Sequence, residues 1–100
     1  MAKKETQKSI TQWAEETFGS VADHSALVDR AAIEMTELAE AVHSNDIIEI
    51  GKETADIVIL LYRLCALNGL DLQAEIDAKM SENRARKWHK AGDGTGSHIK

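Results

Sequence analysis

Four acidic residues with repeated spacing are the side chains of this sequence best suited to chemistry. Glu34 and Glu37 are three residues apart, and so are Glu53 and Asp56, with apolar residues around both pairs. Residues three apart on a helix are neighbours on its surface. If two antiparallel helices bring the pairs together, carboxylates about 5 Å apart repel by roughly 3 kcal/mol at an effective dielectric near 20. Such a cluster requires protons or cations, and hard divalent ions prefer oxygen ligands.

Ordinary ion pairs within helices are the competing interpretation of these acids. Arg30 with Glu34 and Lys52 with Asp56 are both four residues apart. Such pairs contribute only a few tenths of a kcal/mol and are common, so spacing alone favours this account slightly. Against it, Asp56 shares its helical arc with Leu60, and an acid on an apolar arc needs a partner.

The acids of the first pair differ in their predicted exposure. Glu34 lies at the edge of the apolar face of its helix, Glu37 lies one step further round, and Glu40 lies nearly opposite. Glu40 is therefore predicted to face solvent. The predicted core face consists of Leu27, Ala31, Met35, Leu38 and Val42.

Helical periodicity and capping residues predict an all-α, four-helix-bundle-like protomer. The helices are expected over residues 9–18, from 23 or 25 to 43, over 47–67 and over 72–88, and the glycine-rich segment 89–100 is expected to be a loop or tail. A chain of this length fits one helical domain, residues 1–100.

The last helix continues an apolar stripe with polar residues. Lys79, Asn83 and Arg86 follow Leu72 and Ile76 at positions where a core helix would carry leucines. One interpretation is a lined pocket whose cations bind phosphates. The other is a helix end that projects into water, where basic residues favour the macrodipole. The sequence does not decide between them.

Charge and composition exclude several classes of partner. The formal net charge of −5 argues against duplex nucleic acid, which a basic face would bind. The charged residues at the N-terminus argue against a signal peptide, and the longest apolar run is too short to span a membrane. Cys65 has no second cysteine to pair with, which fits a reducing compartment, so we expect a cytoplasmic protein.

The ordered motifs resemble those of the MazG-like, all-α nucleoside triphosphate pyrophosphohydrolases. The resemblance covers about Asp29 to Trp88. It consists of Glu34-x-x-Glu37, fifteen intervening residues, Glu53-x-x-Asp56, the segment Gly69 to Leu72, and Lys79-x-x-x-Asn83-x-x-Arg86.

This resemblance implies hydrolysis of an NTP or dNTP between the α and β phosphates, with Mg²⁺ or, as a substitute, Mn²⁺. The implied metal ligands are Glu34, Glu37, Glu53 and Asp56, and the implied substrate-binding residues are Lys79, Asn83 and Arg86. Glu37 is the residue we expect to activate the water. Many members have a further glutamate where this chain has Ile33, which makes the base the weakest point of the assignment.

The resemblance also implies a homodimer or homotetramer, and the third helix, apolar nearly all round, independently favours one. Two other functions stay open: phosphoribosyl-ATP pyrophosphatase, and a non-catalytic helical interaction module. Trp13 and Trp88 could stack on a base, but core or interface positions are commoner for tryptophan. The sequence predicts no base or sugar preference.

Overall fold

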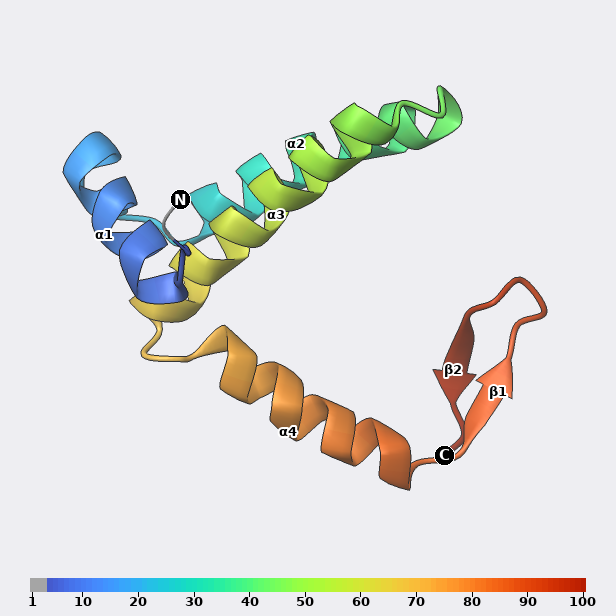
Figure 1. Ribbon diagram of the computed structural model, residues 1–100. Coiled ribbons are helices and arrows are strands. Elements are labelled where there is room, and N and C mark those ends of the chain that lie inside the picture. Colours follow the sequence, from blue (N-terminus) through green and yellow to red (C-terminus); the bar gives the residue numbers. More distant parts are fainter. Residues whose placement is uncertain (1–3) are drawn as a thin grey trace.

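Four helices make up most of the chain and confirm the all-α class (Figure 1). The structure is a computed structural model that describes residues 4–100, so the first three residues of the charged N-terminus lie outside it. The elements are α1 (Gln7–Phe18), α2 (Ser25–His43), α3 (Ile47–Leu67), α4 (Leu72–Ala85), β1 (Trp88–Lys90) and β2 (Gly96–His98). No helix within residues 4–100 is both long enough and apolar enough to cross a membrane.

Side-chain caps fix where three helices begin. Asp46 accepts from the backbone N–H of Glu49 at the start of α3, and Asp71 accepts from Ala74 at the start of α4. These bonds satisfy N–H groups that have no partner within the helix. Helix α1 begins two residues before the predicted residue 9, because Thr6 is the cap.

Helices α2 and α3 pack side by side as an antiparallel pair, and α1 packs on α3 (Figure 1). Their seam follows residues alternately three and four apart. On α2 the less exposed positions are Leu27, Ala31, Glu34, Leu38 and Ala41, and on α3 they include Ile50, Glu53, Ile57, Leu60, Leu64 and Leu67. A glutamate therefore occupies a core position on each of the two helices.

The predicted core face of α2 was wrong at two positions. Met35 and Val42 are each 52% exposed, and the neighbouring Glu34 and Ala41 face the seam instead. Leu27, Ala31 and Leu38 belong to the predicted core face and also to the observed seam, so the apolar pattern does not distinguish the two. Glu40 is exposed, as predicted.

Helix α4 and the hairpin extend away from the other three helices (Figure 1). Gln7 fastens the base of α4, because its side-chain amide donates to the Leu70 carbonyl at 2.8 Å and accepts from the Leu72 N–H at 2.8 Å. The radius of gyration is 16.2 Å, whereas a compact domain of this length has about 13 Å. The accessible surface is 7810 Å², against roughly 5600 Å² for a compact monomer of this mass. One copy therefore leaves much of its surface uncovered.

The C-terminal segment forms a short hairpin, which corrects the prediction of a loop or tail over 89–100. Strands β1 and β2 are antiparallel, with Trp88 opposite His98. Gly96 makes this pairing possible, since a Cβ there would collide with the His89 carbonyl. Strands of three residues are too short to produce a readable alternation in the sequence.

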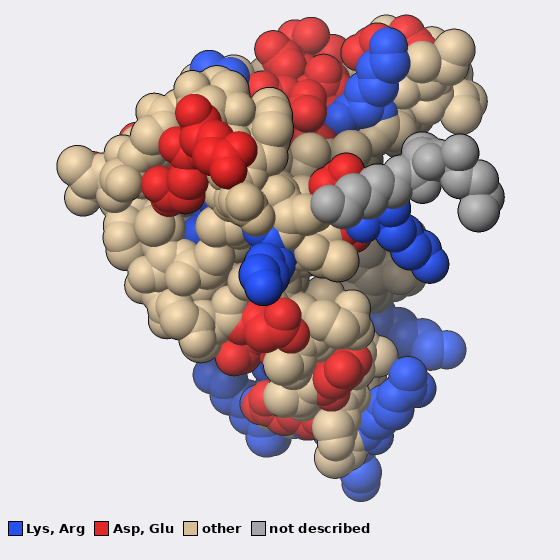
Figure 2. Space-filling model, turned by 60° about the vertical axis from the view of Figure 1, so that its left-hand side comes forward, with Lys and Arg blue, Asp and Glu red and all other residues tan. Residues whose placement is uncertain are grey.

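Charge is distributed unevenly between this end and the rest of the chain. Five of the twelve Lys and Arg residues follow residue 83, together with a single acid, Asp93. In the face shown in Figure 2, acidic side chains form separate patches, and most of the visible Lys and Arg side chains lie in the lower half. The segment from residue 84 onward is therefore basic, although the whole chain is acidic.

Candidate functional site

Three carboxylates converge where α2 and α3 face each other. Glu34 and Glu37 of α2 and Glu53 of α3 each place one oxygen within 4.8 Å of the other two. The Glu34 side chain is 13% exposed, and the Glu53 Oε2 atom is buried and has no hydrogen-bond partner within residues 4–100. Three acids this close, with an unpartnered buried oxygen, require a proton or a cation. We call Glu34, Glu37 and Glu53 the carboxylate cluster.

A shared proton explains the titration of this cluster. Hydrogen bonding with Glu34, desolvation and the negative charges of Glu34 and Glu37 together raise the pKa of Glu53 to about 7. The same hydrogen bond, helped by Glu37 and the charge of Arg30, lowers the pKa of Glu34 despite desolvation. A divalent cation would replace the proton, and its preference for carboxylate oxygens fits all three side chains.

Asp56 is the one predicted ligand outside the carboxylate cluster. It follows Glu53 by almost one turn of α3 and lines a cavity of about 520 Å³ together with Glu34. The cavity lies between α1, α2 and α3, and it begins beside the carboxylate cluster, since Glu34 belongs to both. The lining residues are Trp13, Phe18, Gly19, Ser20, Val21, Ala26, Leu27, Arg30, Glu34, Asp56, Ile59, Leu60 and Arg63. A volume of this size suits a small organic ligand.

Two aromatic side chains of α1 and two arginines, one from α2 and one from α3, line the cavity. Trp13 and Phe18 meet edge to face, with ring centroids 5.5 Å apart. The Arg63 guanidinium lies 5.7 Å from the centre of the Phe18 ring. Arg30 pairs with Glu34 at 3.5 Å, the ion pair expected from its spacing. The sequence alone predicts no role for Phe18 or Arg63, although Arg63 interrupts an otherwise apolar run.

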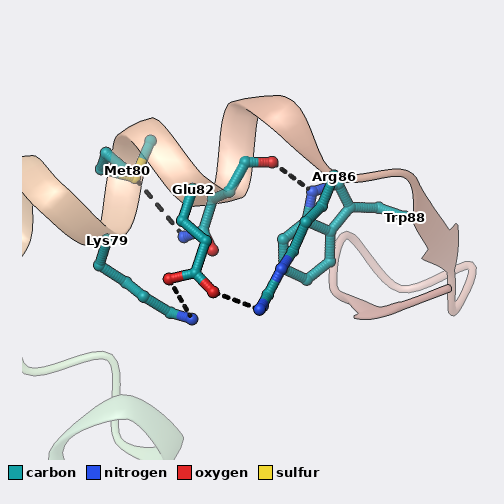
Figure 3. A network of polar contacts seen from close by, with 6 residues as sticks. Lys79, Met80, Glu82, Arg86 and Trp88 are labelled. Atoms are coloured by element: carbon teal, nitrogen blue, oxygen red, sulfur yellow. Dashed lines mark hydrogen bonds and ion pairs between the residues drawn. The ribbon is translucent and has the colours of Figure 1, made fainter. Parts of the chain in front are cut away.

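Lys79 and Asn83 of α4, and Arg86 directly after its end, are not among the residues that line this cavity. Figure 3 shows Lys79 and Arg86 on either side of Glu82. Glu82 pairs with Lys79 at 3.5 Å and also with Arg86. The backbone carbonyl of Asn83 accepts from the Trp88 indole N–H at 2.8 Å and from the Arg86 N–H at 3.2 Å. Within one chain, the basic group therefore forms a surface network at the end of a projecting helix.

Two phage proteins are similar to this chain in sequence. The dATP/dGTP diphosphohydrolase of Salmonella phage PMBT28 is 33% identical over 95 residues, which are 95% of this chain and 31% of that protein. The dATP/dGTP diphosphohydrolase of Cyanophage S-2L is 38% identical over 66 residues, which are 66% of this chain and 59% of that protein. The chain thus spans less than two thirds of the length of either relative.

A solved structure has the same fold. It is a Cyanophage S-2L MazG-like pyrophosphohydrolase bound to dGDP and three catalytic Mn²⁺ ions per active site. The TM-score is 0.74 at 30% identity, and the match covers 94% of this chain and 89% of the other. The predicted MazG-like fold is therefore confirmed.

The family model of phosphoribosyl-ATP pyrophosphohydrolase matches residues 3–83. This range contains the carboxylate cluster, the cavity and α4 as far as Asn83. The chain therefore belongs to the phosphoribosyl-ATP pyrophosphohydrolase family and has its MazG-like, all-α fold.

Proposed function

We propose that this protein is a Mg²⁺-dependent nucleoside triphosphate pyrophosphohydrolase, which cleaves a (d)NTP to the (d)NMP and pyrophosphate. The observation that carries the proposal is the carboxylate cluster beside a cavity lined with aromatic rings. The cluster fits the cations that accompany phosphates, and the cavity fits a nucleoside. The names of the phage relatives and the nucleotide and Mn²⁺ ions in the structural neighbour support the same activity.

Glu34, Glu37 and Glu53 would hold the divalent cations, Mg²⁺ or Mn²⁺, with Asp56 as a fourth ligand at the cavity edge. When bound, the cations supply Lewis-acid stabilisation of the phosphate oxygens and of the leaving pyrophosphate. The buried oxygen of Glu53 supports this assignment, since it has no other partner among residues 4–100.

Glu37 is our choice for the group that accepts a proton from the attacking water. Glu34 and Glu53 lie partly buried in the seam, whereas Glu37 is exposed at its rim. A base at the rim can meet a water that arrives from solvent, and it must lie within hydrogen-bond reach of that water. The residue directly before Glu34 is Ile33, whose apolar side chain cannot act as a second base.

The phosphate-binding residues Lys79, Asn83 and Arg86 would come from the α4 of a second copy. In a single chain this helix projects away from the acids, and its Ile76 and Met80 are 46% and 40% exposed. A homodimer or homotetramer would cover these side chains and bring the basic end of α4 to an acidic surface. Both the excess accessible surface and the opposite charges of the two regions support this arrangement.

A panel of NTPs and dNTPs tests the proposal. With Mg²⁺ or Mn²⁺, pyrophosphate and the monophosphate should appear in equal amounts, without orthophosphate as a first product. Glu40 is an exposed acid on α2, the helix that carries Glu34 and Glu37. The control variant Glu40→Gln should therefore leave the rate of hydrolysis nearly unchanged. No turnover of any nucleotide with any divalent cation would contradict the proposal.

Phosphoribosyl-ATP is the second candidate substrate, because the matching family model carries that description. The same product analysis decides between the candidates. Turnover of phosphoribosyl-ATP together with inactivity toward all simple (d)NTPs would favour it. The 33% and 38% identities to dATP/dGTP diphosphohydrolases favour the simple nucleotides.

A further inference from the structure

Arg63 is a buried cation that has no acidic partner among the residues that the structure describes. Its residue is 8% exposed, and it is the only charged residue that is buried within residues 4–100. Its Nη2 atom makes no hydrogen bond, and no acid in that part of the chain lies within ion-pair distance. The Phe18 ring at 5.7 Å offsets only part of the desolvation penalty. A buried guanidinium with an unused donor is therefore expected to serve a ligand that enters the cavity.

The position of Arg63 along α3 indicates which part of a ligand it meets. Arg63 follows Asp56 by seven residues, which corresponds to about 10 Å along the helix axis. It follows Glu53 by ten residues, or about 15 Å. A nucleotide with its phosphates at the acids would therefore place its base near Arg63 and Phe18, with the sugar between them. Aromatic rings and a planar guanidinium both suit the flat face and edge of a base.

We propose that Arg63 reads the base and selects purines that carry a carbonyl at C6, such as guanine and hypoxanthine. The arginine fork donates two parallel hydrogen bonds, and the O6 and N7 atoms of guanine accept both. Adenine offers N7 but places an amino donor at C6, so one arginine N–H is left without an acceptor. The inference rests on the proposed function, because it assumes that the substrate phosphates bind at the carboxylate cluster.

Phosphate binding is the competing role for a buried arginine, and the two roles predict different patterns. A base reader changes the ratio between nucleotides, whereas a phosphate binder changes all rates equally. The cavity favours the first role, because Arg63 contacts the aromatic side, whereas Asp56 and Glu53, which would attract the phosphate-bound cations, lie about two and about three turns away along α3.

The unmodified protein gives the first test through kcat/KM for dGTP, dITP and dATP with Mg²⁺. We expect dGTP and dITP to be similar and dATP to be roughly ten- to a hundredfold poorer. A dITP rate as low as that of dATP would overturn the inference, because the 2-amino group would then be the feature recognised. This test does not depend on whether any variant folds.

Arg63→Met gives the second test, since methionine keeps a long unbranched side chain but has no donor for O6 and N7. Its preference for dGTP over dATP should fall to about one, chiefly through a lower rate with dGTP. The matched control is Arg30→Met, which removes a cation of the same cavity and should alter both rates equally. An unchanged preference in Arg63→Met, or an equal loss with both nucleotides, would overturn the inference.

Binding of monophosphates separates this inference from the proposed function. Trp88→Phe leaves Trp13 in the cavity as the only tryptophan, so its fluorescence reports a bound base. With Mg²⁺ present, which a monophosphate needs to bind beside the acids, dGMP and dIMP should bind roughly ten- to a hundredfold more tightly than dAMP, and Arg63→Met in this background should abolish the difference. Equal affinities would overturn the role of Arg63, even if the protein hydrolyses dNTPs. Absence of hydrolysis with this selectivity intact would overturn only the proposed function.

Discussion

The unit formed by α1–α3 and the arm formed by α4 and the residues after it differ in how they hold charged side chains. Within residues 4–100, the charged side chains of Glu53 and Arg63 in the unit have buried polar atoms without partners. On the arm, Lys79, Glu82 and Arg86 are more exposed and paired with one another, and the buried atom without a partner there is the neutral amide oxygen of Asn83. Unpartnered buried groups are costly and persist where a ligand completes them. Paired surface charges contribute little to stability in water. The first region thus has the features of a binding site, whereas the second becomes part of one only after assembly.

Removal of a carboxylate from the unit should have the largest effect. We expect Glu53→Gln to lower kcat/KM by more than about a hundredfold, because even groups that only support a metal ligand typically contribute ten- to a hundredfold. Steady-state kinetics with saturating Mg²⁺ measure the loss, and circular dichroism checks the fold. An activity within tenfold of the unmodified protein would remove the cluster from the site.

The arm should matter less, and it should act in a second copy. Arg86→Ala is expected to lower kcat/KM by roughly ten- to a hundredfold, because a charge-assisted phosphate contact contributes about 1.5–3 kcal/mol. If Arg86 acts in the site of another copy, subunit exchange with Glu53→Gln should restore activity. In a random equal mixture of dimers about a quarter of the sites would be intact.

The activity after subunit exchange shows whether Arg86 acts in the site of another copy. Each parent variant alone serves as the baseline, and the two are compared before and after exchange at equal total concentration. Mixtures that never exceed the average of the parents would mean that α4 serves the site of its own chain or no site at all.

Metal binding should distinguish the two regions through stability. At a Mg²⁺ concentration a hundred times the Kd, a site present only in the folded state stabilises it by about 2.7 kcal/mol. For a chain of this size that corresponds to a rise in Tm of roughly 10–20 °C. Glu53→Gln should lose most of the rise, and Lys79→Ala on the arm should keep it. An equal shift in both variants, or none in the unmodified protein, would favour a non-catalytic helical module.

Features that depend on local chemistry could be predicted from the sequence. The caps Asp46 and Asp71 bond to residues three positions on, so the starts of α3 and α4 were confirmed. The approach of Glu34, Glu37 and Glu53 followed from their spacing, once two helices were expected to pair. These are properties of a helix and its immediate neighbours.

Features that depend on distant parts of the chain were missed. The register of α2 depends on what α3 presents to it, so the exposure of Met35 was not predicted. The role of Phe18 depends on where α1 packs, because only that packing sets the ring against Arg63. The separation of Asp56 from the carboxylate cluster has the same origin, because the packing of α1 on α3 forms the cavity that Asp56 lines.

The pH dependence of stability should show the smallest effect and should also arise in the unit. The pKa of Glu53 is raised from 4.5 to about 7 in the folded chain, so protonated Glu53 stabilises the fold. That contribution is complete below about pH 4.5 and is lost as the pH rises through about 7. The lowered pKa values of Glu34, Asp23 and Asp93 act below this window, because their contributions are lost only as the pH falls below the ordinary carboxyl values.

In a chelator, the Tm of the unmodified protein should therefore decrease between pH 4.5 and 7 relative to Glu53→Gln, which cannot titrate at that position. The variant is the appropriate reference, because both proteins contain the same four histidines. With Mg²⁺ present, the Tm of the unmodified protein should instead increase over this pH range relative to Glu53→Gln. The cation competes with the shared proton for the carboxylates, so its binding strengthens as that proton dissociates. Parallel curves for the two proteins would mean that Glu53 is not held protonated by its neighbours. The buried oxygen of Glu53 would then need another partner.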